Sequence, residues 1–140
     1  MTMPAPVNQP FTLFDVAQRG MSAQLVRMNA AASNLANAGT VSSTEEGTYR
    51  PIRPVFAEEV DRASGLATVR VEAVVRENAK AIREHNPGHP LADANGDVWT
   101  SPVDENAEMV EMLESARQYQ NLVEALSTAK QLMLDTMRLK

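Results

Sequence analysis

The sequence contains no cysteine, so neither a disulfide framework nor thiol chemistry is available to it. Aromatic residues make up only 4% of the chain, and eight methionines must supply much of the adaptable apolar contact. No stretch approaches the run of about 18 apolar residues that marks a membrane-spanning helix. Residues 1–10 lack a basic cluster followed by an apolar run, so we expect no cleaved secretory signal, and their three prolines predict a flexible tail.

Positive charge is also scarce, because 13 basic residues stand against 18 acidic ones and give a net charge of −5. Seven of the 13 lie between Arg50 and Arg83, but the acidic residues interleaved with them are typical of a solvated mixed face. A surface that tracks phosphates needs concentrated lysine and arginine, so we expect no nucleic-acid partner.

Residues 101–140 are predicted to form one long helix. No glycine or proline follows Pro102, Ser101 is the expected N-cap, and Asp104 completes a variant of the capping box. At about 1.5 Å per residue, this helix is about 50 Å long, too long for the flank of a compact domain. Apolar residues recur along it at alternating steps of three and four, interrupted at Lys130. The stripe comprises Met109, Met112, Ala116, Tyr119, Val123, Leu126, Met133 and Met137.

Further leucines beside this stripe widen the apolar surface, so the helix needs neighbours on more than one side. Two arrangements stay open. In one, the helix forms a simple hairpin with a single other helix. In the other, copies of the helix surround one another in an assembly. Acidic residues crowd its first turns, which opposes binding to an anionic membrane surface, and we expect no direct lipid binding.

Residues 11–38 are predicted to form a second helix, because Phe14, Met21, Met28 and Leu35 recur at intervals of seven. Alanines on the neighbouring positions allow a partner helix to approach closely. Gly20 costs about 1 kcal/mol relative to alanine in a helix and is a candidate position for a bend.

The middle of the chain is predicted to be a small β module. Residues 39–47 indicate a loop, 55–60 and 67–75 indicate strands, and 97–100 indicate a short strand that leads into the last helix. The segment 76–84 is ambiguous, because residues 79–82 favour a helix but the segment is short and ends in a turn cluster.

The chain therefore divides into a tail over 1–10, a helix over 11–38, a loop and β module over 39–100, and a helix over 101–140. This order predicts an α+β fold, in which the long N- and C-terminal helices form an antiparallel coiled-coil-like pair with a small inserted β module. Isolated helices draw most of their stability from packing. We therefore expect the ends of the lone subunit to be partly disordered and to become ordered on assembly.

Two patterns resemble metal sites but favour turns. His85 and His89 are four residues apart in a turn cluster rather than on a helix, and no third ligand accompanies them. A calcium-like loop begins at Asp93, but Val98 replaces the glycine of the sharp turn and Asp104 replaces the bidentate glutamate. No catalytic motif is present either, so we expect no enzyme activity, no metal and no cofactor.

Residues 31–38 (AASNLANA) resemble the N-terminal signature of the axial proteins of the bacterial flagellum, which form its rod and hook. Small residues permit close helix packing there, and Asn34 and Asn37 can bond backbone groups where the helix ends. Three further stretches are similar to those of the proximal rod proteins within that family. They are residues 86–96 (NPGHPLADANG), residues 108–120, which contain EMVEM and SARQYQ, and residues 127–130 (STAK).

The resemblance implies a structural subunit of the proximal rod of the flagellar basal body. Such a subunit self-assembles through its terminal helices into the tubular drive shaft that transmits torque from the rotor to the hook, with its β module outside. The implied partners are other copies of the chain, sister rod proteins and the junction of the rotor ring with the export gate. The implied location is the rod where it crosses the periplasm, reached through the flagellar type III apparatus without signal cleavage.

The residues expected to pack in this assembly come from both helices. They are Phe14, Met21, Met28, Asn34, Leu35, Asn37, Met109, Met112, Tyr119, Val123, Leu126, Met133 and Met137. The alternative function is that of a soluble coiled-coil adaptor whose apolar seam binds one partner helix.

Overall fold

Two helices and five strands make up the computed structural model, which describes residues 12–139. The helices are α1 (Leu13–Ala36) and α2 (Glu105–Arg138). The strands are β1 (Val41–Ser42), β2 (Ile52–Val60), β3 (Ala67–Arg76), β4 (Ile82–His85) and β5 (Asp97–Thr100). The predicted α+β class, with two long helices at the ends of the chain and a β insertion between them, is confirmed.

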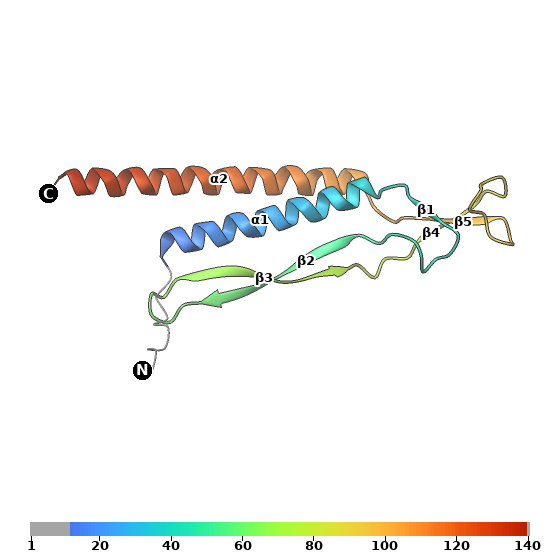
Figure 1. Cartoon of the computed structure of the whole chain (residues 1–140), viewed down its shortest axis with the longest axis horizontal. Helices are drawn as coiled ribbons and strands as arrows, with labels where there is room; N and C mark the ends of the chain where they lie inside the picture. Colours follow the sequence, from blue (N-terminus) through green and yellow to red (C-terminus); the bar gives the residue numbers. More distant parts are fainter. Residues whose placement is uncertain (1–11, 140) are drawn as a thin grey trace, which may run out of the picture.

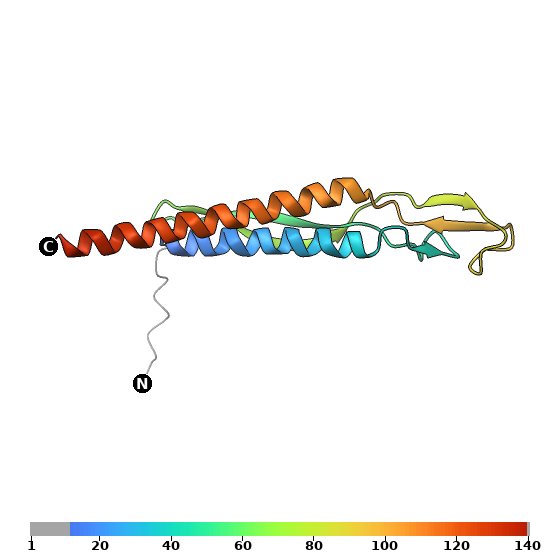
Figure 2. The ribbon, with the colours of Figure 1, turned by 90° about the horizontal axis from the view of Figure 1, so that it is seen from above.

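The elongated body has three layers, with α1 in the middle (Figure 1). α2 covers one side of α1, and the hairpin of β2 and β3 lies along the other side. A second view shows α1 and α2 running side by side while the second sheet extends beyond them (Figure 2). With 34 residues, α2 is about 50 Å long, so it extends beyond α1 at the C-terminal end of the chain.

α1 begins with a complete capping box, which the sequence contains but our prediction overlooked. The Thr12 hydroxyl oxygen accepts a hydrogen bond from the Asp15 amide at 3.2 Å, and the Asp15 carboxylate accepts one from the Thr12 amide at 2.9 Å. Because these bonds satisfy free amides of the first turn, the helix begins at Leu13. The predicted tail over 1–10 and residue 11 of the predicted helix lie outside the described residues. It ends at Ala36 with Asn37 as C-cap, two residues before the predicted end.

The predicted start of the last helix is wrong by several residues. Ser101 is not the N-cap, because its amide donates to the Thr40 carbonyl at 3.0 Å and keeps the chain extended beside β1. Asp104 caps the helix instead, and its carboxylate accepts bonds from the amides of Asn106 and Ala107 at 3.0 and 3.2 Å. The helix therefore begins at Glu105.

The β module consists of two separate sheets. β2 and β3 form a long antiparallel hairpin whose register runs from Ile52 opposite Arg76 to Val60 opposite Ala67. The register shifts between Val55 and Phe56, which is a bulge of the kind that twists a strand edge away from unwanted pairing. Both strands are longer than their predicted ranges.

The second sheet has three short strands in the order β1, β5, β4. Its members resolve two uncertain predictions: β4 makes part of the ambiguous segment a strand, and β1 places a two-residue strand within the predicted loop 39–47. The predicted strand 97–100 is confirmed as β5, which pairs with both neighbours. The turn before it needs a glycine, because Gly96 has a φ of 78°.

Small residues let the layers approach closely. Ala23, Ala30 and Ala31 of α1 are buried. Gly20 lies inside an uninterrupted helix, so the suggested bend is not present. A Cβ atom at Gly20 would lie 3.1 Å from Cδ1 of Leu122, which shows that this glycine permits the close approach of α2.

We predict that Gly20→Val destabilises the protein by about 1 to 3 kcal/mol, because the added methyl groups overpack the contact with Leu122. The free energy of unfolding in urea, followed by circular dichroism, measures this. Gln18→Val introduces the same side chain at an exposed position of α1 and should change stability by no more than about 0.5 kcal/mol. Equal effects of the two substitutions would contradict the close-contact role of Gly20.

Candidate assembly interface

The seam between the two helices follows a heptad pattern on α2. Ser115 is fully buried, and the half-buried residues Tyr119, Leu122, Leu126 and Ala129 follow it at steps of four and three. Near the start of α1 the seam opens into an apolar groove of about 170 Å³. The groove is lined by Leu13, Val16 and Ala17 of α1 and by Leu122, Ala125, Leu126 and Ala129 of α2.

The structure divides the predicted packing residues into two groups. One group is half-buried within the subunit and comprises Phe14, Met21, Met28, Leu35, Met112, Tyr119 and Leu126. The other group is exposed on α2 and comprises Met109, Val123, Met133 and Met137. Our prediction omitted Leu122, which lies closest to α1 at Gly20, because the predicted stripe placed Val123 in the seam.

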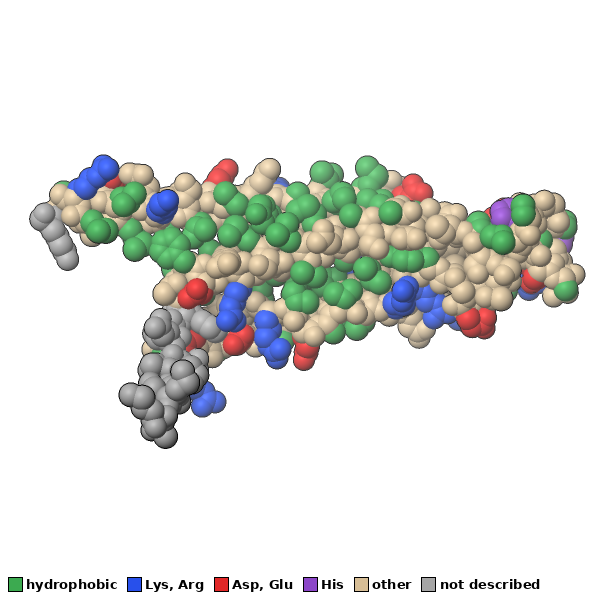
Figure 3. Space-filling view, in the orientation of Figure 1, with side chains coloured by type: hydrophobic (Ala, Val, Ile, Leu, Met, Phe, Trp, Pro, Cys, Tyr) green, Lys and Arg blue, Asp and Glu red, His purple; other side chains and the backbone are tan. Residues whose placement is uncertain are grey.

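The exposed group belongs to a set of exposed apolar side chains along α2, some outside the seam and some beyond the end of α1, which we call the α2 outer stripe. It consists of Met109, Leu113, Val123, Met133 and Met137, and 43 to 70% of the surface of each is exposed. Figure 3 shows apolar side chains gathered along α2, whereas charged side chains are frequent along the hairpin. Burying one such side chain contributes about 1.5 to 3 kcal/mol. Contact of these side chains with a neighbouring subunit would therefore be strongly favourable.

Asn34 ties the end of α1 to the beginning of β2. Its side chain is fully buried, and its amide group donates to the Ile52 carbonyl at 3.0 Å while its oxygen accepts from the Ile52 amide at 2.8 Å. The Tyr49 hydroxyl donates to the same oxygen at 2.8 Å. Asn34 thus bonds both backbone groups of a residue 18 positions away, rather than the end of its own helix as predicted.

Asn37 has the predicted role at the helix end. Its side-chain amide donates to the Ser33 carbonyl at 2.8 Å, and its backbone amide caps the last turn. This contact satisfies a carbonyl that would otherwise lack an intrahelical partner.

An ion pair between a buried carboxylate and a partly exposed arginine joins α2 to the hairpin. Glu108 is only 1% exposed and pairs with Arg53 of β2, which also lies 3.6 Å from Glu77. The hydrogen bond that Arg53 donates to Glu108 raises the pKa of Arg53 above its usual range. One turn along, Arg27 of α1 donates to Glu111 at 2.7 Å. Sequence analysis did not select these residues, because their partners lie far apart along the chain.

At the far end of the molecule, Asp97 organises the three-stranded sheet. Its carboxylate accepts from Arg83 Nε at 2.7 Å and lies 2.9 Å from His85 Nδ1. The His85 hydrogen bond, followed by that of Arg83, lowers the pKa of Asp97. Asp93 accepts from two backbone amides of its own turn. Within residues 12–139 no group of three histidine or acidic side chains could hold a metal ion.

Comparison with known proteins points to one family. Residues 14–41 match the family described as flagella basal body rod protein, and residues 94–139 match the C-terminal family of the flagellar basal body rod FlgEFG proteins. These two segments contain most of α1 and all of α2. Across the helices of residues 12–139, none is both long and apolar enough to cross a bilayer.

Full-length relatives agree with these matches. The flagellar basal-body rod protein FlgC of Salmonella typhimurium is 43% identical over 129 residues, which cover 91% of this chain and 95% of the relative. FlgC of Escherichia coli O157:H7 has the same identity and coverage. FlgC of Agrobacterium fabrum is 30% identical over 125 residues, which cover 89% of this chain and 90% of the relative.

We predict that Asn34→Asp destabilises the subunit by about 1 to 3 kcal/mol, because the substitution removes the donor to the Ile52 carbonyl and leaves that group unsatisfied. Urea unfolding measures the effect. Asn121→Asp makes the same chemical change at an exposed position of α2 and serves as the control, with an expected effect below about 0.5 kcal/mol. An unchanged midpoint of urea unfolding for Asn34→Asp would contradict the role of Asn34 in anchoring β2 to α1.

We also predict a pH-dependent contribution from Asp97. Because its pKa is lower in the folded state, its stabilising effect is complete above the unfolded pKa of about 3.9. The effect is lost as pH falls through the folded pKa. The difference in unfolding free energy between the wild type and Asp97→Asn should therefore be constant above about pH 5 and shrink below pH of about 4. Fluorescence of Trp99, the single tryptophan, reports on this sheet, and a pH-independent difference would contradict the assignment.

Proposed function

The chain belongs to the FlgC family of bacterial flagellar basal-body rod proteins, and from that premise we propose how its structure serves the rod. It is a structural subunit of the basal-body rod. In our proposal, α1 and α2 form the assembling unit of the proximal rod, and α2 presents the surface that joins one subunit to the next.

The exposed α2 outer stripe is the observation that supports this proposal. Leu113 is 69% exposed beside α1, and Met137 is 70% exposed where α2 extends beyond α1, although both are large apolar side chains. A helix with an apolar second face needs a second neighbour. Helices of further copies and of sister rod proteins supply that neighbour, and the stripe is then buried in the tubular assembly.

The same arrangement suits a drive shaft. Side-by-side helices, of which α2 is about 50 Å long, resist twisting through many small contacts distributed along their length. In the proposal the hairpin and the three-stranded sheet lie outside this helical layer, and the hairpin is fastened to it by Asn34 and by the pair of Arg53 with Glu108.

The finer parts of the proposal concern partners and chemistry. We propose contacts with copies of the chain, with sister rod proteins and with the junction of the rotor ring and the export gate. We assign the protein no catalytic role. Export through the flagellar type III apparatus and ordering of the chain ends on assembly stay predictions. The alternative of a soluble adaptor gains no support from membership of a rod family.

We predict that Met109→Asp combined with Leu113→Asp abolishes swimming and removes the subunit from purified basal bodies, because the substitutions place charge in the buried stripe. Both positions are more than half exposed in the subunit, so its thermal unfolding should change little. Leu126 is unsuitable for this test, because it lines the groove inside the subunit.

Gln118→Asp is the matched control. It is exposed and lies nine residues from Met109, or about two and a half helical turns, on the opposite side of α2. Swimming and basal-body content are measured in cells that carry each variant as the sole copy. Normal motility of the double variant would refute the role of the stripe.

A further inference from the structure

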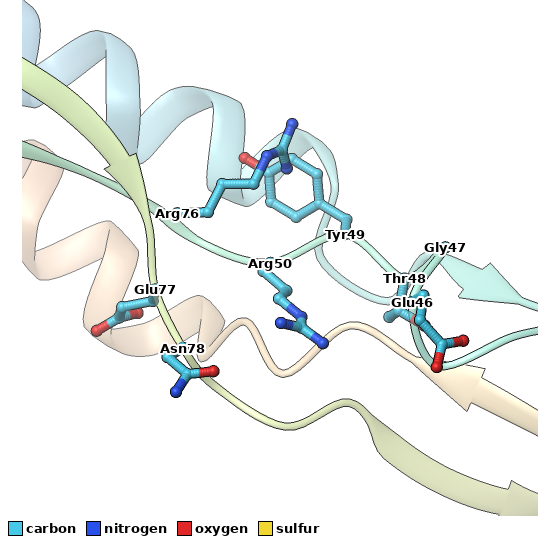
Figure 4. Close-up of a pocket in the computed structure, with 8 residues that line it drawn as sticks. All are labelled: Glu46, Gly47, Thr48, Tyr49, Arg50, Arg76, Glu77 and Asn78. Atoms are coloured by element: carbon cyan, nitrogen blue, oxygen red, sulfur yellow. The ribbon is translucent and has the colours of Figure 1, made fainter.

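Beyond the helical layer, a polar cleft lies where the hairpin meets the three-stranded sheet. It has a volume of about 610 Å³ and is formed by residues 46–50, which lead into β2, and by residues 76–78, which comprise the last residue of β3 and the two that follow it (Figure 4). The two segments are joined beside it by the hydrogen bond from the Glu77 amide to the Pro51 carbonyl at 2.8 Å.

Arg50 extends into this cleft without a partner. Its Nε atom is buried and makes no hydrogen bond, and within residues 12–139 its guanidinium group forms no ion pair. Figure 4 shows the guanidinium group between the side chains of Glu77 and Asn78 on one side and Thr48 and Glu46 on the other. The part of the guanidinium group that lines the cleft has no acceptor within the described residues, so it can bond one that comes from elsewhere.

A second arginine, Arg76, lines the cleft, with its guanidinium group turned toward Tyr49 and away from that of Arg50 (Figure 4). The Arg76 guanidinium lies 5.8 Å from the centre of the Tyr49 ring, and the Tyr49 hydroxyl is fixed by Asn34. Arg76 also makes no ion pair within the described residues. The stacked ring positions Arg76, but it does not neutralise its charge.

The carboxylates that line the cleft leave these cations available. Glu77 is 3.6 Å from Arg53, on the side of the hairpin that faces Glu108. Glu46 is exposed and forms no ion pair in residues 12–139. The Arg50 guanidinium, with the side chain of Asn78 beside it, can pair with a carboxylate through two parallel hydrogen bonds, the bidentate geometry by which arginine recognises this group.

We propose that this cleft, the Arg50 cleft, binds a glutamate side chain from α2 of a second copy of the chain. This inference rests on the proposed function, because α2 is the element that assembly brings against neighbouring subunits. Three exposed glutamates of α2 make no ion pair in their own subunit and are the candidates: Glu105, Glu114 and Glu124. The chain is acidic overall, so copies repel one another unless such cations meet such carboxylates.

The test is charge reversal in cells that carry a single copy of the gene. Arg50→Glu should lower the amount of the protein in purified basal bodies by at least about tenfold, because two carboxylates then face each other across the interface. Arg62→Glu makes the same change at the exposed turn of the hairpin and should leave incorporation unchanged. Circular dichroism of each purified variant checks that it folds. Arg50→Met keeps the buried stem of the side chain and should also reduce incorporation, which retains the test if Arg50→Glu does not fold.

The occupant is identified by restoring the pair. Glu105→Arg, Glu114→Arg and Glu124→Arg are each combined with Arg50→Glu, and one combination should recover swimming and incorporation. Wild-type incorporation of both Arg50 variants, or failure of all three combinations to rescue, would overturn the proposal. Absence of the wild-type protein from basal bodies would instead overturn the proposed function, so the two failures are distinguishable.

Discussion

The close packing of α1 between two other layers is the constraint on which the rest of the structure depends. Its buried side chains are alanines and Asn34, and Gly20 leaves room for Leu122, so both α2 and the hairpin approach its backbone closely. Small side chains bury little area per residue, and this inner seam alone cannot supply the stability of a large core. The subunit therefore depends on its polar contacts to position the layers, and on neighbouring subunits to bury more of its apolar surface.

The buried polar groups explain why the layers adopt a single register. An alanine-rich seam tolerates sliding by a heptad, because one small side chain resembles the next. Two polar contacts do not tolerate such sliding, because a shift would leave a buried polar group without a partner. They are the contacts of Asn34 with Ile52 and of Arg53 with Glu108. Leaving such a buried group without a hydrogen-bond partner costs about 1 to 3 kcal/mol, which is large against the differences between alternative seams. Polar residues thus specify the arrangement that apolar residues stabilise.

These same features mark what could be predicted from the sequence. Heptad spacing identifies both helices, and the alternation of valines identifies β3, because periodicity is a local property. The N-cap at Asp104 was missed, since the Ser101 amide bonds to Thr40, a contact between distant segments. The seam was placed partly on Val123 rather than Leu122, because α2 is apolar on two adjacent faces and spacing does not say which one meets α1. The partners of Asn34, Arg53 and Asp97 lie beyond the reach of local patterns.

The two surfaces assigned to assembly differ in what they contribute. Burial of the α2 outer stripe is favourable but non-directional, since apolar side chains accept many relative positions of a neighbouring helix. The Arg50 cleft is directional, because a guanidinium group pairs well with a carboxylate only in a narrow range of geometries. It lies at the opposite end of α1 from the apolar groove at Leu13, so a contact there fixes the axial position of a neighbour. Apolar contact supplies the free energy of assembly, and the ion pair selects its register. The same division of roles is found within one subunit, where apolar residues stabilise the arrangement and polar residues specify it.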